Sequence, residues 1–273
     1  MPLIFDIVDL CHIINDMFIA VDIGNTNVTI GVFKDFNVLR SFKFETGLLK
    51  TSKKCAALIK DKLSLFLPPK EDVEGVYACS VVPSLNNNIR SILKPIFKSK
   101  VNVVGEDINA PVMNRYRIPS QVGQDRLINA YAGLKLYGAG LIIVDFGTAI
   151  TFDVVSKKSE YLGGLIVPGL KLMQECLNKK TALLPYVELS RPMEIIGRDT
   201  VSSIRSGLVY GVASLCDGVI ERLMNKECKG YKVISTGGDV ELIKPYSSRI
   251  SNIENFLILK GLRLIHNSQS RGR

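Results

Sequence analysis

Phe18-Ile-Ala-Val21 runs directly into Asp22-Ile-Gly-Asn-Thr-Asn27, and a further apolar stretch continues to Phe33. A second copy of this pattern lies at mid-chain, where Leu141-Ile-Ile-Val144 runs into Asp145-Phe-Gly-Thr-Ala149 before another apolar stretch. Each copy predicts a buried strand, a tight Asp-x-Gly turn and a second strand. The copies lie a domain's length apart, which indicates two similar halves rather than a short repeat.

The residues of the turn suit phosphate binding. Glycine lets the backbone bend so that N–H groups face phosphate oxygens, while Asn and Thr add neutral donors. The leading Asp can hold a cation or its water shell. Asp and Gly also dominate ordinary hairpin turns, so one copy alone favours a plain turn. Two copies in matching contexts favour two turns that hold a polyphosphate from both sides of a cleft, as in a nucleotide-dependent phosphotransferase.

Composition bounds the class of protein. The 273 residues suit one large or two mid-sized domains, and 47% hydrophobic with 22% charged residues is ordinary for a globular protein. No apolar run is long enough to span a bilayer, so we expect a soluble protein without a membrane partner. Six cysteines form no C-x-x-C pair, which predicts reduced thiols and a cytoplasmic location.

The chain termini are expected to lie outside the folded part. Residues 1–16 contain three aspartates and no Lys or Arg, which does not fit a secretory signal. This segment is either an amphipathic extension or the result of a start site set too early; we favour the second, because Met17 directly precedes the first strand. Residues 267–273 are polar and are expected to fray.

Charge and histidine content restrict the chemistry. The net charge of +9 comes from dispersed basic residues without a stripe of aromatics, which favours a solvated surface and argues against a nucleic-acid partner. The two histidines, His12 and His266, lie near the termini, which argues against a histidine zinc site or a histidine base. The mechanism is therefore expected to use carboxylates.

Strands and helices alternate along the rest of the chain, which predicts a mixed α/β fold in two similar halves. Beyond the two hairpins, we expect strands at 38–44, 75–82, 101–104, 160–167 and 231–235. We expect helices at 52–66, 84–97, 124–137, 169–177, 204–225 and 253–264. Pro68-Pro69 ends the first helix, and Ser84 is the expected N-cap of the second.

A set of motifs occurs in one order along the chain after Met17. They are Asp22-Ile-Gly-Asn-Thr-Asn, Ser80-Val-Val-Pro, Gly123-Gln-Asp-Arg126, Asp145-Phe-Gly-Thr-Ala, Gly163-Gly-Leu-Ile-Val-Pro-Gly169 and Thr236-Gly-Gly. Together they resemble the type III pantothenate kinase family. The resemblance implies the acetate/sugar kinase–Hsp70–actin superfold, with a nucleotide cleft between two RNase H-like halves, and a homodimer. It implies phosphorylation of the primary hydroxyl of pantothenate by Mg-ATP, the first step of coenzyme A biosynthesis.

The resemblance also implies domains and site residues. The domains would be an extension at 1–16, halves at 17–117 and 118–268, and a disordered tail at 269–273. The ATP-binding residues would be Asp22, Ile23, Gly24, Asn25, Thr26, Asn27, Val28, Thr29 and Thr148. The pantothenate-binding residues would be Tyr116, Gly123, Gln124, Asp125, Arg126 and Thr181. Asp125 would be the catalytic base, Asp145 would hold a monovalent cation, K⁺ or NH₄⁺, and Thr236-Gly-Gly would lie by the adenosine.

Several alternatives stay open from the residues alone. Asp125 is either a base or a first-turn helix residue paired with Arg126. Chemistry does not decide which of Asp22 and Asp145 holds Mg²⁺. Gln124 stands where the family usually has Ala, so a longer side chain could narrow the substrate pocket or add a hydrogen bond. A kinase for another small alcohol, or a regulatory factor on the same fold, therefore remains a second hypothesis.

Overall fold

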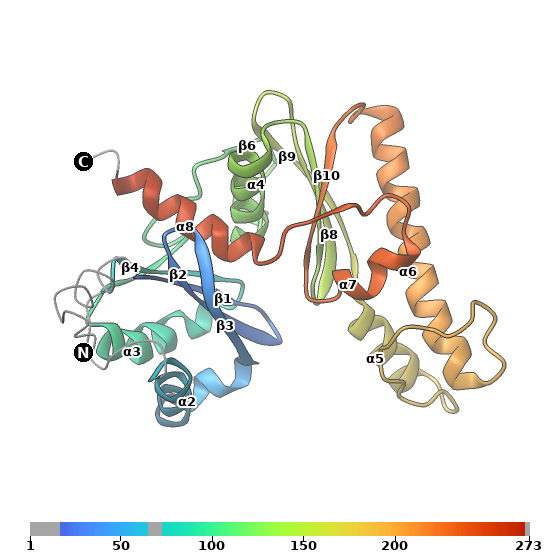
Figure 1. Ribbon diagram of the computed structural model, residues 1–273, viewed down its shortest axis with the longest axis horizontal. Helices are drawn as coiled ribbons and strands as arrows, with labels where there is room; N and C mark the ends of the chain where they lie inside the picture. Colours follow the sequence, from blue (N-terminus) through green and yellow to red (C-terminus); the bar gives the residue numbers. More distant parts are fainter. Residues whose placement is uncertain (1–16, 65–72, 271–273) are drawn as a thin grey trace, which may run out of the picture. The chain divides into compact units, whose positions relative to one another are not determined.

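The computed structural model describes residues 17–64 and 73–270 and divides them into two compact units (Figure 1). The first unit comprises the described residues up to Pro111 together with Gly123–Ile128 and the chain from Ile258 onward. The second unit comprises Val112–Val122 and Asn129–Leu257. The segment 1–16 and the Pro68-Pro69 helix stop lie outside the described residues.

The sheet of the first unit is built around β1. Its strands are β1 (Met17–Ile23), β2 (Asn27–Lys34), β3 (Asn37–Glu45), β4 (Gly75–Ser80) and β5 (Val101–Val103), in the order β3-β2-β1-β4-β5. β1 pairs antiparallel with β2, and β2 antiparallel with β3. On its other side β1 pairs parallel with β4, and β4 parallel with β5.

The second unit repeats this arrangement around β7. Its strands are β6 (Met113–Asn114), β7 (Leu141–Phe146), β8 (Ala149–Val155), β9 (Glu160–Pro168), β10 (Lys232–Gly237) and β11 (Asn252–Ile253), in the order β11-β10-β7-β8-β9-β6. β7 is antiparallel to β8 and parallel to β10, as β1 is to β2 and β4. Apart from the short β6 at the edge, the two sheets have the same order and strand directions. The prediction of a mixed α/β fold in two similar halves is therefore confirmed.

Helices cover both faces of the first sheet. Side chains of a strand alternate between faces, and Ile19 and Val21 pack in one core with Ile59 of α2 (Ser52–Ser64) and Ile89 of α3 (Asn86–Phe97). On the other face lies α8 (Leu257–Ser270), whose side chain of Leu259 leaves no room for a side chain at Gly31. The last helix therefore belongs to the core of the first unit.

Helices also cover both faces of the second sheet. The long α6 (Thr200–Lys226) shares a core with Ile142 and Val144 of β7, and α5 (Leu170–Lys180) adds Leu170 to it. α4 (Gln124–Tyr137) lies on the opposite face, where Gly133 meets the side chain of Ile143. The remaining elements are α7 (Val240–Ile243), η1 (Thr46–Lys50), η2 (Pro83–Leu85), η3 (Pro119–Gln121) and η4 (Lys244–Tyr246). Among the described residues, no helix is both long and apolar enough to cross a membrane.

Local capping explains where the element boundaries differ from the prediction. Ser84 is not the N-cap of α3: Pro83 starts a short 3₁₀ turn, and Leu85 occupies the cap position without a side-chain hydrogen bond. α6 begins at Thr200 rather than near Ile204, because Asp199 and Ser202 form a reciprocal capping box. α8 continues to Ser270 rather than ending near Leu264, and Tyr77 Oη donates a 3.2 Å hydrogen bond to Gln269 near its end.

Asp217 on α6 fixes the loop that follows η4. Its carboxylate accepts hydrogen bonds from the Ser247 hydroxyl, from the backbone N–H and the hydroxyl of Ser248 at 2.8 Å, and from the backbone N–H of Arg249 at 3.1 Å. Burial alone would raise the pKa of Asp217, but these donors outweigh it and lower the pKa below its ordinary value. The ionised carboxylate therefore holds the chain between η4 and β11.

Replacing Asp217 with Ala should lower the free energy of unfolding at neutral pH by about 1–2 kcal/mol, because the loop donors lose a charged acceptor. The contribution is present above the unfolded-state pKa of about 3.9 and is lost as pH falls through the lower folded-state pKa. Urea unfolding at neutral and acidic pH measures the difference. Glu221→Ala, one turn later on α6 and 3.9 Å from Arg249, should change little at either pH. An equal loss at both pH values would contradict the role of the carboxylate.

Candidate functional site

The first Asp-x-Gly turn is held by hydrogen bonds from within the turn and from outside it. Gly24 N–H donates to Asn27 O at 2.9 Å, which closes the turn between β1 and β2. Thr46 donates its hydroxyl to Gly24 O at 2.7 Å and its backbone N–H to Thr26 O at 3.0 Å. Thr46 is buried, and the sequence motifs do not include it because it lies two strands later in the chain. The turn is therefore fixed before any ligand binds.

The side chains of the predicted phosphate loop divide by burial. Ile23 and Val28 are fully buried and belong to the hydrophobic core, so only their backbone groups are available to a ligand. Asn25 is exposed at the tip, and Thr26 and Thr29 are half-buried. The turn thus offers backbone N–H groups and neutral polar side chains, the donors expected of a phosphate loop.

Asp125 lies in the first turn of α4, and its carboxylate folds back over Gly123. A Cβ added at Gly123 would lie 2.4 Å from Asp125 Oδ1, so this conformation requires glycine two residues before the Asp. Burial raises the pKa of Asp125 above its ordinary value, while the backbone N–H and the charge of Arg126 partly oppose the rise. A carboxylate with a raised pKa is a stronger proton acceptor.

Cys79 lies near two predicted site carboxylates, those of Asp22 and Asp125. On β4 it pairs in register with Asp22 of β1, and its side chain is fully buried. Burial, followed by the charges of Asp22 and Asp125, raises the pKa of the Cys79 thiol well above its ordinary value. The structure therefore brings Asp22 and Asp125 within electrostatic reach of one neutral thiol.

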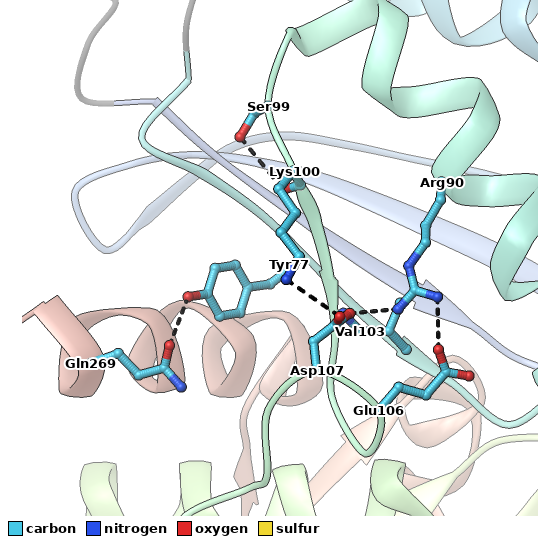
Figure 2. A network of polar contacts seen from close by, with 8 residues as sticks. All are labelled: Tyr77, Arg90, Ser99, Lys100, Val103, Glu106, Asp107 and Gln269. Carbon is cyan, nitrogen blue, oxygen red and sulfur yellow. Dashed lines mark hydrogen bonds and ion pairs between the residues drawn. The ribbon is translucent and has the colours of Figure 1, made fainter.

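Gln124 packs against the loop that follows β5. A Cβ at Gly105, whose φ is +93°, would lie 2.6 Å from Gln124 Cγ. This loop is tied to α3 by a polar network in which the Arg90 guanidinium forks onto Glu106 and Asp107 (Figure 2). The glycine at position 105 therefore accommodates the Gln124 side chain.

The second Asp-x-Gly turn is supported by the start of α5. Gly147 N–H donates to Ala149 O at 3.1 Å, and Gly169 N–H donates to Thr148 O at 3.0 Å. A Cβ at Gly169 would lie 2.3 Å from Gly147 O, so the helix start needs glycine to approach the turn. Thr148 itself is exposed at the tip, where a phosphate would be accessible.

Asp145 is surrounded by a helix residue and a glycine turn. Asn129 Nδ2, from α4, donates a 2.9 Å hydrogen bond to Asp145 Oδ2. Gly237, with a φ of +100°, lies on the other side, where a Cβ would be 2.6 Å from Asp145 Oδ1 and 2.5 Å from Phe146 N. The Thr236-Gly-Gly segment at the end of β10 therefore meets the second Asp-x-Gly turn at the ends of adjacent parallel strands. Asn129, which belongs to none of the sequence motifs, thus contacts a predicted site residue.

The remaining predicted residues have local roles in the structure. The ring of half-buried Tyr116 lies 3.1 Å from the position that a Cβ of Gly163 on β9 would take, so the absence of a side chain at Gly163 lets the ring come close. Arg126 is buried. Thr181 ends α5, donating its hydroxyl to Leu177 O at 2.8 Å and accepting from Leu184 N–H at 3.3 Å.

The predicted site residues fall into two groups, one in each unit. The first unit holds the turn 22–29 and Gly123–Arg126, and the second holds Tyr116, Asp145, Thr148 and Thr181. Within 17–64 and 73–270, no three His, Cys, Asp or Glu side chains gather as metal ligands would. A cation at either turn would therefore depend on few protein carboxylates.

Comparison with solved structures supports the fold. A Campylobacter jejuni protein assigned to the Baf family of transcriptional activators matches with a TM-score of 0.57 at 18% identity, over 93% of this chain and 99% of that one. An activator of 2-hydroxyisocaproyl-CoA dehydratase from Clostridium difficile matches with a TM-score of 0.52 at 12% identity, over 93% of this chain and 97% of that one. With the two matching sheets, these likenesses confirm the predicted acetate/sugar kinase–Hsp70–actin superfold.

Sequence comparison gives the family. The sequence model of type III pantothenate kinase matches residues 18–222. The type III pantothenate kinases of Geobacter sp. (strain M21) and of Citrifermentans bemidjiense are each 39% identical over 250 residues, which cover 92% of this chain and 98% of each relative. The chain belongs to the type III pantothenate kinase family.

Proposed function

We propose that this protein transfers the γ-phosphoryl group of ATP to the primary hydroxyl of pantothenate, the first step of coenzyme A biosynthesis. The family supports the reaction, and one observation in the first unit carries the mechanism. The Asp125 carboxylate is held over Gly123 at the start of α4, and burial raises its pKa. This arrangement is suited to accepting the proton of an attacking alcohol.

The proposed step balances as a phosphoryl transfer. The pantothenate hydroxyl oxygen forms a bond to the γ-phosphorus, the bond from that phosphorus to the bridging oxygen breaks, and ADP leaves. The hydroxyl proton passes to an Asp125 carboxylate oxygen. Positioning and charge neutralisation dominate such reactions, so the preformed turns contribute by holding phosphates in place.

We assign the remaining contacts by the family resemblance. The turn 22–29, with Thr148 of the second turn, would bind the ATP phosphates, and exposed Asn25 and Thr148 support this assignment. Tyr116, Gly123–Arg126 and Thr181 would bind pantothenate. For Gln124 the contact would come from its backbone, because its side chain packs against Gly105.

Two cations belong to the proposal. Asp145 fits a monovalent cation, K⁺ or NH₄⁺, because its carboxylate supplies hard oxygen ligands and a single negative charge. Mg²⁺ would bind mainly through the ATP phosphates, as it usually does. Together the cations would neutralise charge on the phosphates.

We propose a homodimer and a cytoplasmic location as well. Large apolar side chains are exposed on β9 and between α5 and α6, at Ile166, Leu183, Met193, Ile195 and Ile196. Exposed apolar surface of this kind marks protein interfaces. Cys55, Cys79, Cys176, Cys216 and Cys228 are free thiols, which suits a reducing compartment.

Purified protein with Mg-ATP should release ADP only when pantothenate is present, and faster in potassium than in sodium buffer. Asp125→Asn should reduce kcat roughly a hundredfold or more while ATP binding persists. Because burial raises the pKa of Asp125, kcat/KM should be lost as pH falls through a value above the ordinary aspartate pKa of about 3.9. Turnover of another small alcohol but not of pantothenate would contradict the proposed substrate. The absence of turnover with any alcohol would contradict it as well.

Gly123→Ala should reduce kcat roughly a hundredfold, because the added methyl group displaces the Asp125 carboxylate. Steady-state kinetics measure kcat. A thermal midpoint close to that of the unmodified protein shows that the variant folds. Gly211→Ala on α6, where a Cβ meets nothing within 4 Å, is the matched control and should keep full activity. Equal activity of the two variants would contradict the positioning of Asp125 by Gly123.

Met193→Glu combined with Ile196→Lys should convert the dimer to a monomer, because charges would replace apolar contacts in the interface. Sedimentation velocity measures the change. Leu39→Lys on β3, an exposed apolar residue of the first unit, should leave the dimer intact. A dimer that survives the double substitution would contradict this interface.

A further inference from the structure

Asn129 has one satisfied and one unsatisfied polar atom. It is 2% exposed, and its Nδ2 donates to Asp145 Oδ2 at 2.9 Å. Its Oδ1 is fully buried and accepts no hydrogen bond from any of the described residues. Buried amide oxygens are usually paired, and this unpaired one lies beside the proposed cation ligand Asp145, which makes it a candidate to bind the same ion.

The orientation of this amide follows from its neighbour. An ionised carboxylate can only accept hydrogen bonds, so Asp145 requires the NH₂ group and not the oxygen of Asn129 to face it. Turning the amide over would set two acceptors against each other. Asp145 therefore fixes where Asn129 Oδ1 lies. Because this oxygen is bonded to the same carbon as Nδ2, it can reach an ion that also touches the Asp145 carboxylate.

The two residues together provide a suitable set of oxygens for a monovalent ion. Asp145 supplies one negative charge and Asn129 a neutral carbonyl, which is a normal ligand of hard cations. Gly237 lies close to this carboxylate, since a Cβ there would be 2.6 Å from Asp145 Oδ1. The single negative charge of this pair matches the charge of a monovalent cation.

We propose that Asn129 is a ligand of the monovalent cation at Asp145, binding it through Oδ1 while its Nδ2 orients the carboxylate. This inference rests on the cation site of the proposed function and adds a residue to it. The Asn129 amide thus has two roles. Its Nδ2 orients the Asp145 carboxylate, and its Oδ1 supplies a neutral ligand. A charged ligand in its place would change the net charge of the site.

Equilibrium dialysis with rubidium ions tests the proposal, since rubidium resembles K⁺ in charge and nearly in size. The full chain is dialysed with and without ADP, so that binding is measured apart from turnover. We expect rubidium binding that K⁺ displaces. Asn129→Ala should weaken it roughly tenfold to a hundredfold, and Asp145→Asn should weaken it at least as much. Lys135→Ala, an exposed residue on the same helix, should bind as the unmodified protein does.

A second variant tests the charge argument even if Asn129→Ala folds poorly. Asn129→Asp keeps an oxygen ligand but sets two carboxylates together, so calcium ions should compete with rubidium better than they do in the unmodified protein. The thermal midpoint should rise in KCl relative to choline chloride for the unmodified protein and not for Asn129→Ala.

Equal rubidium affinity in Asn129→Ala and Lys135→Ala, or unchanged calcium competition in Asn129→Asp, would overturn the proposal. Absence of rubidium binding to the unmodified protein would overturn it too, whatever the kinase assay gives. Rubidium binding without phosphorylation of pantothenate would instead count against the proposed function alone.

Discussion

Each sheet depends on one strand with two kinds of neighbour. β1 and β7 are antiparallel to the strand that follows them and parallel to a strand from later in the chain. The antiparallel partner forces a tight turn at the carboxyl end, and the parallel partner brings a second carboxyl end beside it. Ligand sites form at such ends in α/β sheets. Asp22 and Cys79 meet there in the first unit, and Asp145 and Gly237 meet there in the second.

The sequence predicted what depends on neighbours along the chain. Both Asp-x-Gly turns, the bounds of α4 at 124–137 and the α/β alternation follow from local patterns. Side-chain contacts between distant segments could not be predicted in this way. Thr46 fixes the first turn across a strand, and Asn129 reaches Asp145 from another element. Asn129 belongs to no sequence motif. Only its burial and its Oδ1 atom, which lacks a hydrogen-bond partner among the described residues, draw attention to it.

Two positions depend on a neighbouring Pro or Gly. Ser84 is a good capping residue, but Pro83 favours a 3₁₀ turn that moves the helix start beyond it. The Gln124 side chain lies against Gly105, a residue with positive φ that offers space, and its contact with the substrate stays a prediction. In both cases the deciding neighbour was a Pro or Gly, whose backbone properties outweigh side-chain preference.

The contrast between Cys79 and Cys176 determines how this protein can be labelled. Cys79 is buried between two acids and stays protonated, so a thiol reagent will not modify it readily. Among the cysteines of the described residues, Cys176 on α5 is the exposed one. Because the chain lacks tryptophan, a fluorophore at Cys176 would report without interference from an intrinsic indole. The fluorophore would report from α5, the helix whose start is hydrogen-bonded to the turn at Thr148.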